Sequence, residues 1–279
     1  MGRSKREGWL IVRGALVREG SLAAREAMRR WSHPCDLSYS ARERSLLARA
    51  LLRWLLVEST GRPFGWRFDV ENSGRPIARH KAGGGGASIA ISHSGGWVAC
   101  VVARCGQIGI DIEIYRPGRN IMGIAGLAFG NAERQDVERE GEAAFYRIWT
   151  SREALAKARG RGLAEAADGI DRVAGSSADC VELRRIGGEA WWLAHGTPME
   201  GFSLAVAFRC SVQGSEPSIT WPINVAPTTQ LLCPPCTETL RSFEWLAHSF
   251  APRIIAGSST IVGSSGGAQV RDLPEPCLL

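Results

Sequence analysis

Residues 96–105 read GWVACVVARC, and residues 201–210 read GFSLAVAFRC. The two segments align without a gap at an offset of 105 residues (201 − 96), and both have the apolar composition of buried strands. The same offset places residues 44–53, which have a helical pattern, on residues 149–158, a second expected helix. Two matches at one offset predict that a helix-plus-sheet unit occurs twice in the chain.

The predicted fold class is therefore α/β (α+β), a pseudo-twofold duplication of two similar helix-plus-sheet lobes with a cleft between them. We expect an N-terminal lobe over residues 1–105 and a C-terminal lobe over residues 106–210. Beyond residue 210 the chain becomes rich in Pro, Ser, Thr and Gly, a composition typical of unpacked segments. We expect residues 211–279 to form an irregular, poorly ordered extension with one short helix near residues 238–250.

The second expected helix begins with WTSREALAKARG at residues 149–160. Ala, Leu, Glu, Lys and Arg favour a helix, and Gly160 followed by Gly162 predicts its end. Trp149, Glu153 and Lys157 are spaced at i, i+4 and i+8, so an aromatic ring, a carboxylate and an ammonium share one face.

An acidic pair lies on a predicted strand over residues 107–114. Alternation along this strand buries its three isoleucines and turns Asp111 and Glu113 to the opposite face. Where these two carboxylates meet Glu153, they favour a hard divalent cation held by oxygen ligands and bridging to phosphate.

The first half of the chain shows weaker signals. A strand over residues 9–17 and a helix over residues 22–31, capped by Ser21, precede a strong helix signal over residues 40–57. Four arginines lie off the apolar stripe of that last helix, and the pattern leaves open whether they form a solvated face or bind an anion. Residues 64–87 are turn-rich and include a run of four glycines that lacks the Lys-Ser/Thr ending of a P-loop.

The formal charge of +6 favours an anionic partner, which could be nucleic acid, a phosphorylated cofactor or an acidic protein. Several of the eight cysteines lie in apolar runs, which favours a reduced, cytoplasmic setting. Cys233 and Cys236 have zinc-ligand spacing without a second pair nearby, so we expect no structural zinc. No stretch reaches the length of a membrane span, and Arg13 interrupts the first apolar run too early for a signal peptide.

Five motifs follow one another along the chain. In chain order they are Gly74-Arg75-Pro76, Ile91-Ser92-His93-Ser94, Gly109-Ile110-Asp111-Ile112-Glu113, Phe129 with Glu133, and Trp149 to Lys157 with the following Gly160-Arg161-Gly162-Leu163. Over roughly residues 40 to 210, their order and spacing resemble those of the Sfp-type 4'-phosphopantetheinyl transferases. Each motif alone is weak, whereas the ordered set is specific.

The resemblance implies that coenzyme A lies in the cleft between the halves and that its 4'-phosphopantetheine moiety passes to a serine of an apo acyl or peptidyl carrier protein, releasing 3',5'-ADP. It implies that Asp111, Glu113 and Glu153 bind Mg²⁺ on the pyrophosphate. Glu153 is also implied as the general base, and Lys157 as the group that neutralises the leaving nucleotide. The other interpretation of Lys157 is an i, i+4 salt bridge with Glu153.

On the nucleotide side, the resemblance implies contacts from Ser92 and from His93, the latter to the 3'-phosphate. Arg75 resembles an adenine-side or phosphate contact, and Arg44 and Ser45 are further candidates for the same phosphate. A guanidinium can grip phosphate through two hydrogen bonds, which suits the arginine at position 75.

The expected partners are carrier proteins of fatty acid, polyketide or nonribosomal peptide biosynthesis, whose acidic helices suit a basic transferase. We expect a monomer, because the duplicated halves already form the cleft. The alternative is a catalytically weak coenzyme A or carrier-protein binding module of the same fold. A nucleic-acid binder is not expected, since the chain lacks a recognisable motif and any aromatic-basic interleaving.

Overall fold

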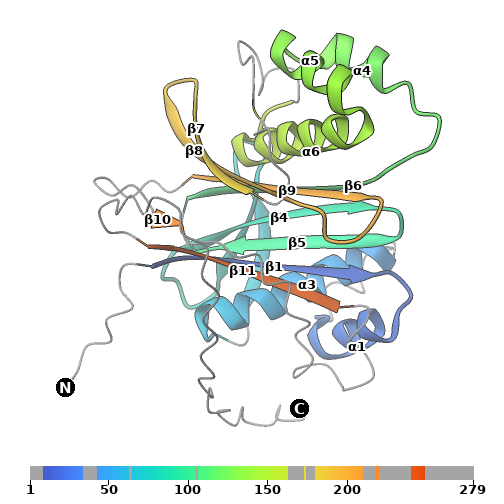
Figure 1. Ribbon diagram of the computed structural model, residues 1–279. Coiled ribbons are helices and arrows are strands. Elements are labelled where there is room, and N and C mark those ends of the chain that lie inside the picture. Colours follow the sequence, from blue (N-terminus) through green and yellow to red (C-terminus); the bar gives the residue numbers. More distant parts are fainter. Residues whose placement is uncertain are drawn as a thin grey trace, which may run out of the picture.

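The structure, a computed structural model, describes residues 9–33, 43–62, 65–104, 106–162, 173, 180–209, 218–219 and 240–248. Two antiparallel sheets lie face to face, and helices cover the outer face of each (Figure 1). In Figure 1, α1 and α3 lie below the larger sheet, while α6 lies above the smaller sheet with α4 and α5 beyond it.

The larger sheet has seven strands in the order β10-β11-β1-β5-β4-β3-β2. The first five strands along the chain are β1 (Trp9–Arg18), β2 (Trp66–Val70), β3 (Pro76–His80), β4 (Gly86–Ser94) and β5 (Trp97–Ala103). The remaining two are β10 (Ser218–Ile219) and β11 (Leu240–His248). Helices α1 (Leu22–Trp31) and α3 (Glu43–Thr60) follow β1, and the Ser21 hydroxyl caps α1 by accepting from the amide of Ala24 at 3.0 Å.

The smaller sheet has four strands in the order β6-β9-β8-β7. Its strands are β6 (Gln107–Ile114), β7 (Cys180–Ile186), β8 (Glu189–Gly196) and β9 (Phe202–Arg209). Helices α4 (Ile121–Ala128), α5 (Asn131–Glu140) and α6 (Glu142–Arg159) follow β6. α6 ends at Gly160, whose left-handed backbone at φ 67° fits a glycine cap.

The predicted duplication is visible in the topology. The order β1-β5-β4-β3 in one sheet matches β6-β9-β8-β7 in the other, and the long helices α3 and α6 occupy the same place between the first and later strands. Residues that correspond at the offset of 105 also face corresponding helices. Cys100 on β5 packs toward α3, and Ala205 on β9 packs toward α6. The predicted lobe ends at residues 105 and 210 fall outside the described residues, so these boundaries stay predictions.

The core consists of four apolar clusters that match the layers. One lies between the helices α1 and α3 and the larger sheet, and a second lies between the two sheets. A third joins α6 to the smaller sheet, and the fourth joins α4, α5 and α6. Because β5 and β9 are buried on both faces, they are the near-continuous apolar runs from which the duplication was inferred.

Three local expectations differ from the structure. The turn-rich segment contains the hairpin β2–β3, and α6 begins at Glu142, seven residues before the predicted start at Trp149. The short helix expected near residues 238–250 is wrong: residues 240–248 form β11, which pairs with β1 from Trp9↔His248 to Val17↔Leu240. An open edge of β1 offers backbone partners that outweigh a weak helical preference.

Other expectations fall outside the described residues, including the Cys233 and Cys236 pair and most of the extension. Within the described ranges, Cys100 is a buried free thiol. No helix in those ranges is both long enough and apolar enough to cross a membrane.

Candidate functional site

The site is built where β6 and α6 touch. Gly109 makes this possible, because a Cβ atom at that position would lie 2.0 Å from the carbonyl oxygen of Ala154 and 2.5 Å from the amide nitrogen of Ala158. On the same face of β6, Asp111 and Glu113 follow at two-residue spacing, while the isoleucines of the other face pack between the sheets. The strand therefore presents two carboxylates to the helix, as its alternation predicted.

α6 meets this strand with one partly exposed stripe. From residue 144 to residue 158, every side chain of α6 is buried except those of Trp149, Glu153 and Lys157. These are the three residues predicted to share a face. Nearby on the helix, a 380 Å³ cavity lies beside Lys157.

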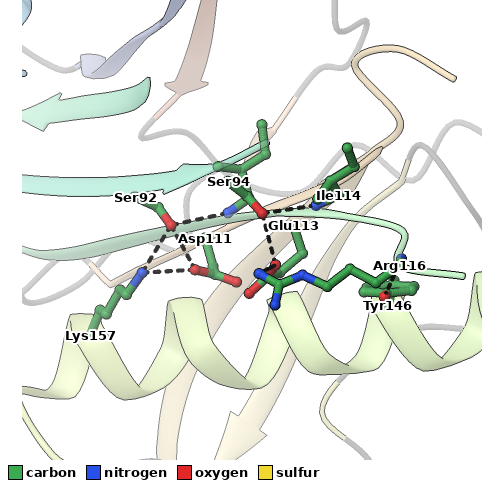
Figure 2. Close-up of polar contacts among 9 residues, drawn as sticks. Ser92, Ser94, Asp111, Glu113, Ile114, Arg116, Tyr146 and Lys157 are labelled. Carbon is green, nitrogen blue, oxygen red and sulfur yellow. Dashed lines mark hydrogen bonds and ion pairs between the residues drawn. The ribbon is translucent and has the colours of Figure 1, made fainter. Parts of the chain in front are cut away.

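Asp111 is the best-anchored carboxylate. Its Oδ1 accepts hydrogen bonds from Lys157 Nζ and from Ser92 Oγ, each at 2.7 Å, and its side chain is nearly buried (Figure 2). Lys157 on α6 thus forms an ion pair with Asp111 on β6. Ser92 Oγ also accepts from Lys157 Nζ at 3.1 Å and from the amide of Ile112 at 3.3 Å. The one proton and both lone pairs of this hydroxyl are therefore engaged within the protein.

Glu113 is held in a similar way, one step further along β6. Its Oε2 accepts from Ser94 Oγ at 2.9 Å, and Ser94 Oγ accepts from the amide of Ile114 at 3.0 Å (Figure 2). The exposed guanidinium of Arg116 lies 4.0 Å from the same carboxylate. The backbone of Arg116 is fixed by its N–H donating to the hydroxyl of Tyr146 at 2.7 Å.

The three carboxylates are close enough to interact electrostatically. Burial raises the pKa of Asp111 above its ordinary value, against the lowering effect of Lys157, and Glu113 raises it further. Burial also raises the pKa of Glu153, and the charge of Asp111 adds to this effect. Asp111 and Glu153 therefore each cost more to ionise here than they would alone in water.

This environment suits a divalent cation. Asp111 Oδ2 is buried and has no hydrogen-bond partner among the described residues, and the neighbouring donors are hard carboxylate oxygens. In the part of the chain that the structure describes, no group of three or more His, Cys, Asp or Glu side chains is arranged to hold a metal ion. A cation with few protein ligands, as Mg²⁺ accepts, fits the arrangement.

The cavity beside the site has walls from both lobes. Ser73, Pro76 and Ile91 come from the larger sheet and its turn, while Lys157 and Arg161 come from α6 and the residues after it. The lobes are in tight contact here: a Cβ atom on Gly160 would lie 2.5 Å from the carbonyl oxygen of Ser73. The cavity therefore lies between the duplicated halves, where a cleft was expected.

Arg75, expected to contact the nucleotide, is engaged inside the protein. It pairs with Glu71 at 2.5 Å, and its Nη1 donates to the carbonyl oxygen of Ala158 at 3.4 Å, near the end of α6. Arg75 thus connects the β2–β3 turn with α6 next to the cavity.

The other expected nucleotide contacts lie on β4 and in the first turn of α3. His93 is exposed and, by strand alternation, points to the face opposite Ser92 and Ser94. Arg44 pairs with Glu19 at 2.6 Å, and Ser45 follows it, partly buried, in the first turn of α3. The amide of Glu19 donates to the Gly96 carbonyl in the β4–β5 turn at 2.8 Å. This hydrogen bond therefore joins Glu19, the partner of Arg44, to the turn that follows His93 and Ser94.

A buried ion pair supports the helix behind the site. Arg152 Nη2 lies 2.6 Å from Glu133 Oε2, with exposed fractions of 3% and 0%, and the other oxygen of Glu133 accepts from the amide of Val173 at 2.7 Å. The guanidinium also lies 5.6 Å from the centre of the Phe129 ring. Arg152 directly precedes Glu153, so the pair fixes the turn of α6 that carries this carboxylate.

Reasoning from the sequence did not identify Ser94 or Arg116 as site residues. A usable signal existed for Ser94, because the Ser92–Ser94 and Asp111–Glu113 pairs have the same two-residue spacing. That signal becomes informative only when β4 and β6 are known to lie against each other.

Comparison with known proteins finds a match over the part of the chain that contains these residues. Residues 107–207 match the model of the 4'-phosphopantetheinyl transferase superfamily. The resemblance to that superfamily is confirmed. The matched segment runs from β6 into β9 and contains Asp111, Glu113, Glu153 and Lys157.

Three similar proteins are 4'-phosphopantetheinyl transferases. HetI of Nostoc sp. is 33% identical over 129 residues, covering 44% of this chain and 54% of HetI. The Bacillus subtilis enzyme is 32% identical over 148 residues, covering 51% of this chain and 61% of the enzyme. AcpT of Salmonella typhi is 40% identical over 74 residues, covering 25% of this chain and 38% of AcpT. The chain thus spans between about two fifths and three fifths of these transferases.

Proposed function

We propose that this protein transfers the 4'-phosphopantetheine moiety of coenzyme A to a serine hydroxyl of an apo acyl or peptidyl carrier protein, with release of 3',5'-ADP and dependence on Mg²⁺. In this reaction the serine oxygen forms a bond to phosphorus, and the pyrophosphate P–O bond to the nucleotide breaks. The supporting observation is the convergence of Asp111, Glu113, Glu153 and Lys157 between β6 and α6.

Asp111, Glu113 and Glu153 are the residues that would hold the cation. Bound Mg²⁺ would neutralise and orient the pyrophosphate oxygens. The hydroxyls of Ser92 and Ser94 donate to Asp111 and Glu113 and so hold both carboxylates in place. Such prior orientation lowers the cost of assembling the site.

Glu153 is the proposed general base. It is only partly buried, and its raised pKa makes it a stronger proton acceptor than an ordinary glutamate. Lys157 is one helical turn away, with about a third of its side chain exposed. We infer that its ammonium stabilises the charge that develops on the departing 3',5'-ADP.

The cavity between the lobes is the proposed site for the nucleotide end of coenzyme A. Its volume of about 380 Å³ and its apolar wall at Pro76, Ala90 and Ile91 suit a flat base, while Lys157 and Arg161 bring positive charge to its α6 side. Arg44, Ser45 and His93 are proposed to serve the 3'-phosphate, and Ser92 to act through Asp111 and Lys157.

One chain supplies the serines of β4 and the carboxylates of β6, which supports a monomer as the active unit. The buried thiol of Cys100 is consistent with a cytoplasmic setting. The net charge of +6 supports an acidic carrier domain as the protein substrate.

The deciding experiment incubates the protein with coenzyme A, Mg²⁺ and a panel of apo carrier proteins, and measures the carrier by intact mass spectrometry. We expect at least one carrier to gain the mass of phosphopantetheine. Glu153→Gln should abolish this gain while coenzyme A still binds. A binding module would show no gain with the wild-type protein and would bind coenzyme A equally well with either residue.

A further inference from the structure

β6 is an edge strand of the smaller sheet, yet its outer edge is covered. One edge pairs with β9, and the other faces β4, which belongs to the larger sheet. Side chains bridge this junction. Three serines of β4 form hydrogen bonds here: Ser88 donates to the carbonyl of Gly106, directly before β6, while Ser92 and Ser94 accept from the amides of Ile112 and Ile114 on β6. We call these three residues the serine ladder.

Ser94 differs from the first member of this ladder. Ser88 donates its hydroxyl proton to the backbone carbonyl of Gly106, whereas Ser94 uses its single hydroxyl proton on Glu113 Oε2 at 2.9 Å. Because the amide of Ile114 occupies a lone pair of the same oxygen, the hydroxyl cannot turn freely, and its proton is aimed at the carboxylate. Ser94 itself is buried, with an exposed fraction of 7%.

We propose that Ser94 is a positioning residue that fixes the Glu113 carboxylate for cation binding. Glu113 has no comparably close partner among the described residues: the guanidinium of Arg116 is 4.0 Å away and 64% exposed. A surface cation at that distance contributes little to orientation. A glutamate has one more side-chain torsion than an aspartate, so Glu113 depends more on such a contact than Asp111 does.

This proposal rests on the proposed function, because it assigns Glu113 to the cation. Its geometry is independent of any reaction. The chain also contains a matched control, since Ser88→Ala removes a hydroxyl from the same strand and the same junction without touching a carboxylate.

The experiment compares Ser94→Ala, Ser88→Ala and the wild-type chain in two measurements. The first is hydrogen exchange at single-residue resolution, in which Ser94→Ala should accelerate exchange of the Ile114 amide. The second is Mn²⁺ affinity in the presence of coenzyme A, followed by electron paramagnetic resonance. Ser94→Ala should weaken Mn²⁺ binding roughly tenfold or more, as loss of a group that orients a metal ligand usually does, while Ser88→Ala stays within about twofold.

The kinetics supply a further readout. The Mg²⁺ concentration giving half-maximal rate should rise for Ser94→Ala, with a smaller change in the rate at saturating Mg²⁺. Unchanged Mn²⁺ affinity in Ser94→Ala, or an equal loss in both variants, would reduce Ser94 to a link between the lobes and overturn the proposal. A wild-type chain that binds Mn²⁺ but modifies no carrier would defeat the proposed reaction and leave the role of Ser94 standing.

Discussion

Gly109 and Ala154 are so close that a side chain at Gly109 would lie 2.0 Å from the carbonyl oxygen of Ala154. This contact sets the distance between the strand that carries two carboxylates and the helix that carries Glu153 and Lys157. The acidic strand therefore needs a glycine at this position.

Gly109→Ala should destabilise the protein by about 3 kcal/mol or more, because the added methyl meets backbone that cannot shift locally. Thermal or denaturant unfolding measures this loss in the free energy of unfolding. The control is Gly126→Ala on α4, where a Cβ meets nothing within 4 Å and a helix gains from alanine. Equal stability of the two variants would show that β6 and α6 are not in this contact.

Glu153→Gln should raise the melting temperature at neutral pH in the absence of divalent metal. The folded-state pKa of Glu153 is raised, so the folded protein holds its proton more tightly than the unfolded chain does. Stability therefore falls as pH rises through the carboxyl range, and the neutral amide removes that loss. Calorimetry between pH 4 and pH 8 should show a flatter profile for the variant, and a steeper one would contradict the assigned pKa direction.

Glu142→Gln serves as the contrast on the same helix. Glu142 lies in the first turn of α6, where a negative charge favours the helix dipole. Its replacement should lower stability slightly and leave transfer to the carrier unchanged.

Arg152→Ala should cost about 3–5 kcal/mol, because it leaves the fully buried Glu133 carboxylate without its cation. Arg29→Ala is the matched surface case: its pair with Glu26 is exposed, and we expect a change within about 1 kcal/mol. Urea unfolding of both variants tests the difference. A small effect at Arg152 would mean that water reaches Glu133.

Lys157→Met should lower the rate of transfer about a hundredfold or more, since it removes a cation from the developing negative charge. It also leaves the Ser92 hydroxyl as the remaining hydrogen-bond donor to Asp111 Oδ1 among the described residues. Single-turnover kinetics with saturating coenzyme A measures the effect, and Arg159→Ala, two residues further on, is the control. A loss confined to coenzyme A affinity would indicate a binding role alone.

The sequence was sufficient to predict strands and side-chain faces where the hydrophobic pattern agrees with the observed burial. Strand β6 was predicted at its observed bounds, and β5 lies within the apolar segment 96–105 that was matched to residues 201–210. A glycine precedes each of these strands, and both faces of each are largely buried. The shared strand face of Asp111 and Glu113 and the shared helix face of Glu153 and Lys157 each follow from local periodicity, so both faces could be predicted.

Features that depend on contacts between segments far apart in the sequence could not be predicted. Residues 240–248 became a strand because β1 has an open edge, and Arg75 turned to the end of α6 because the lobes meet there. The start of α6 was missed because Phe145 and Tyr146, weak helix formers, are held by their own apolar cluster. Ser94 was missed because its meaning depends on β4 lying against a strand of the other sheet.

The internal repeat divides the chemistry unequally between its two copies. At the offset of 105 residues, Glu153 and Lys157 correspond to Ala48 and Leu52, which are buried in the apolar core under the larger sheet. The first copy has aliphatic packing where the second has charge, so the symmetry of the backbone does not generate a twin reaction centre. Titration should accordingly reach saturation at one coenzyme A and one catalytic cation for every polypeptide.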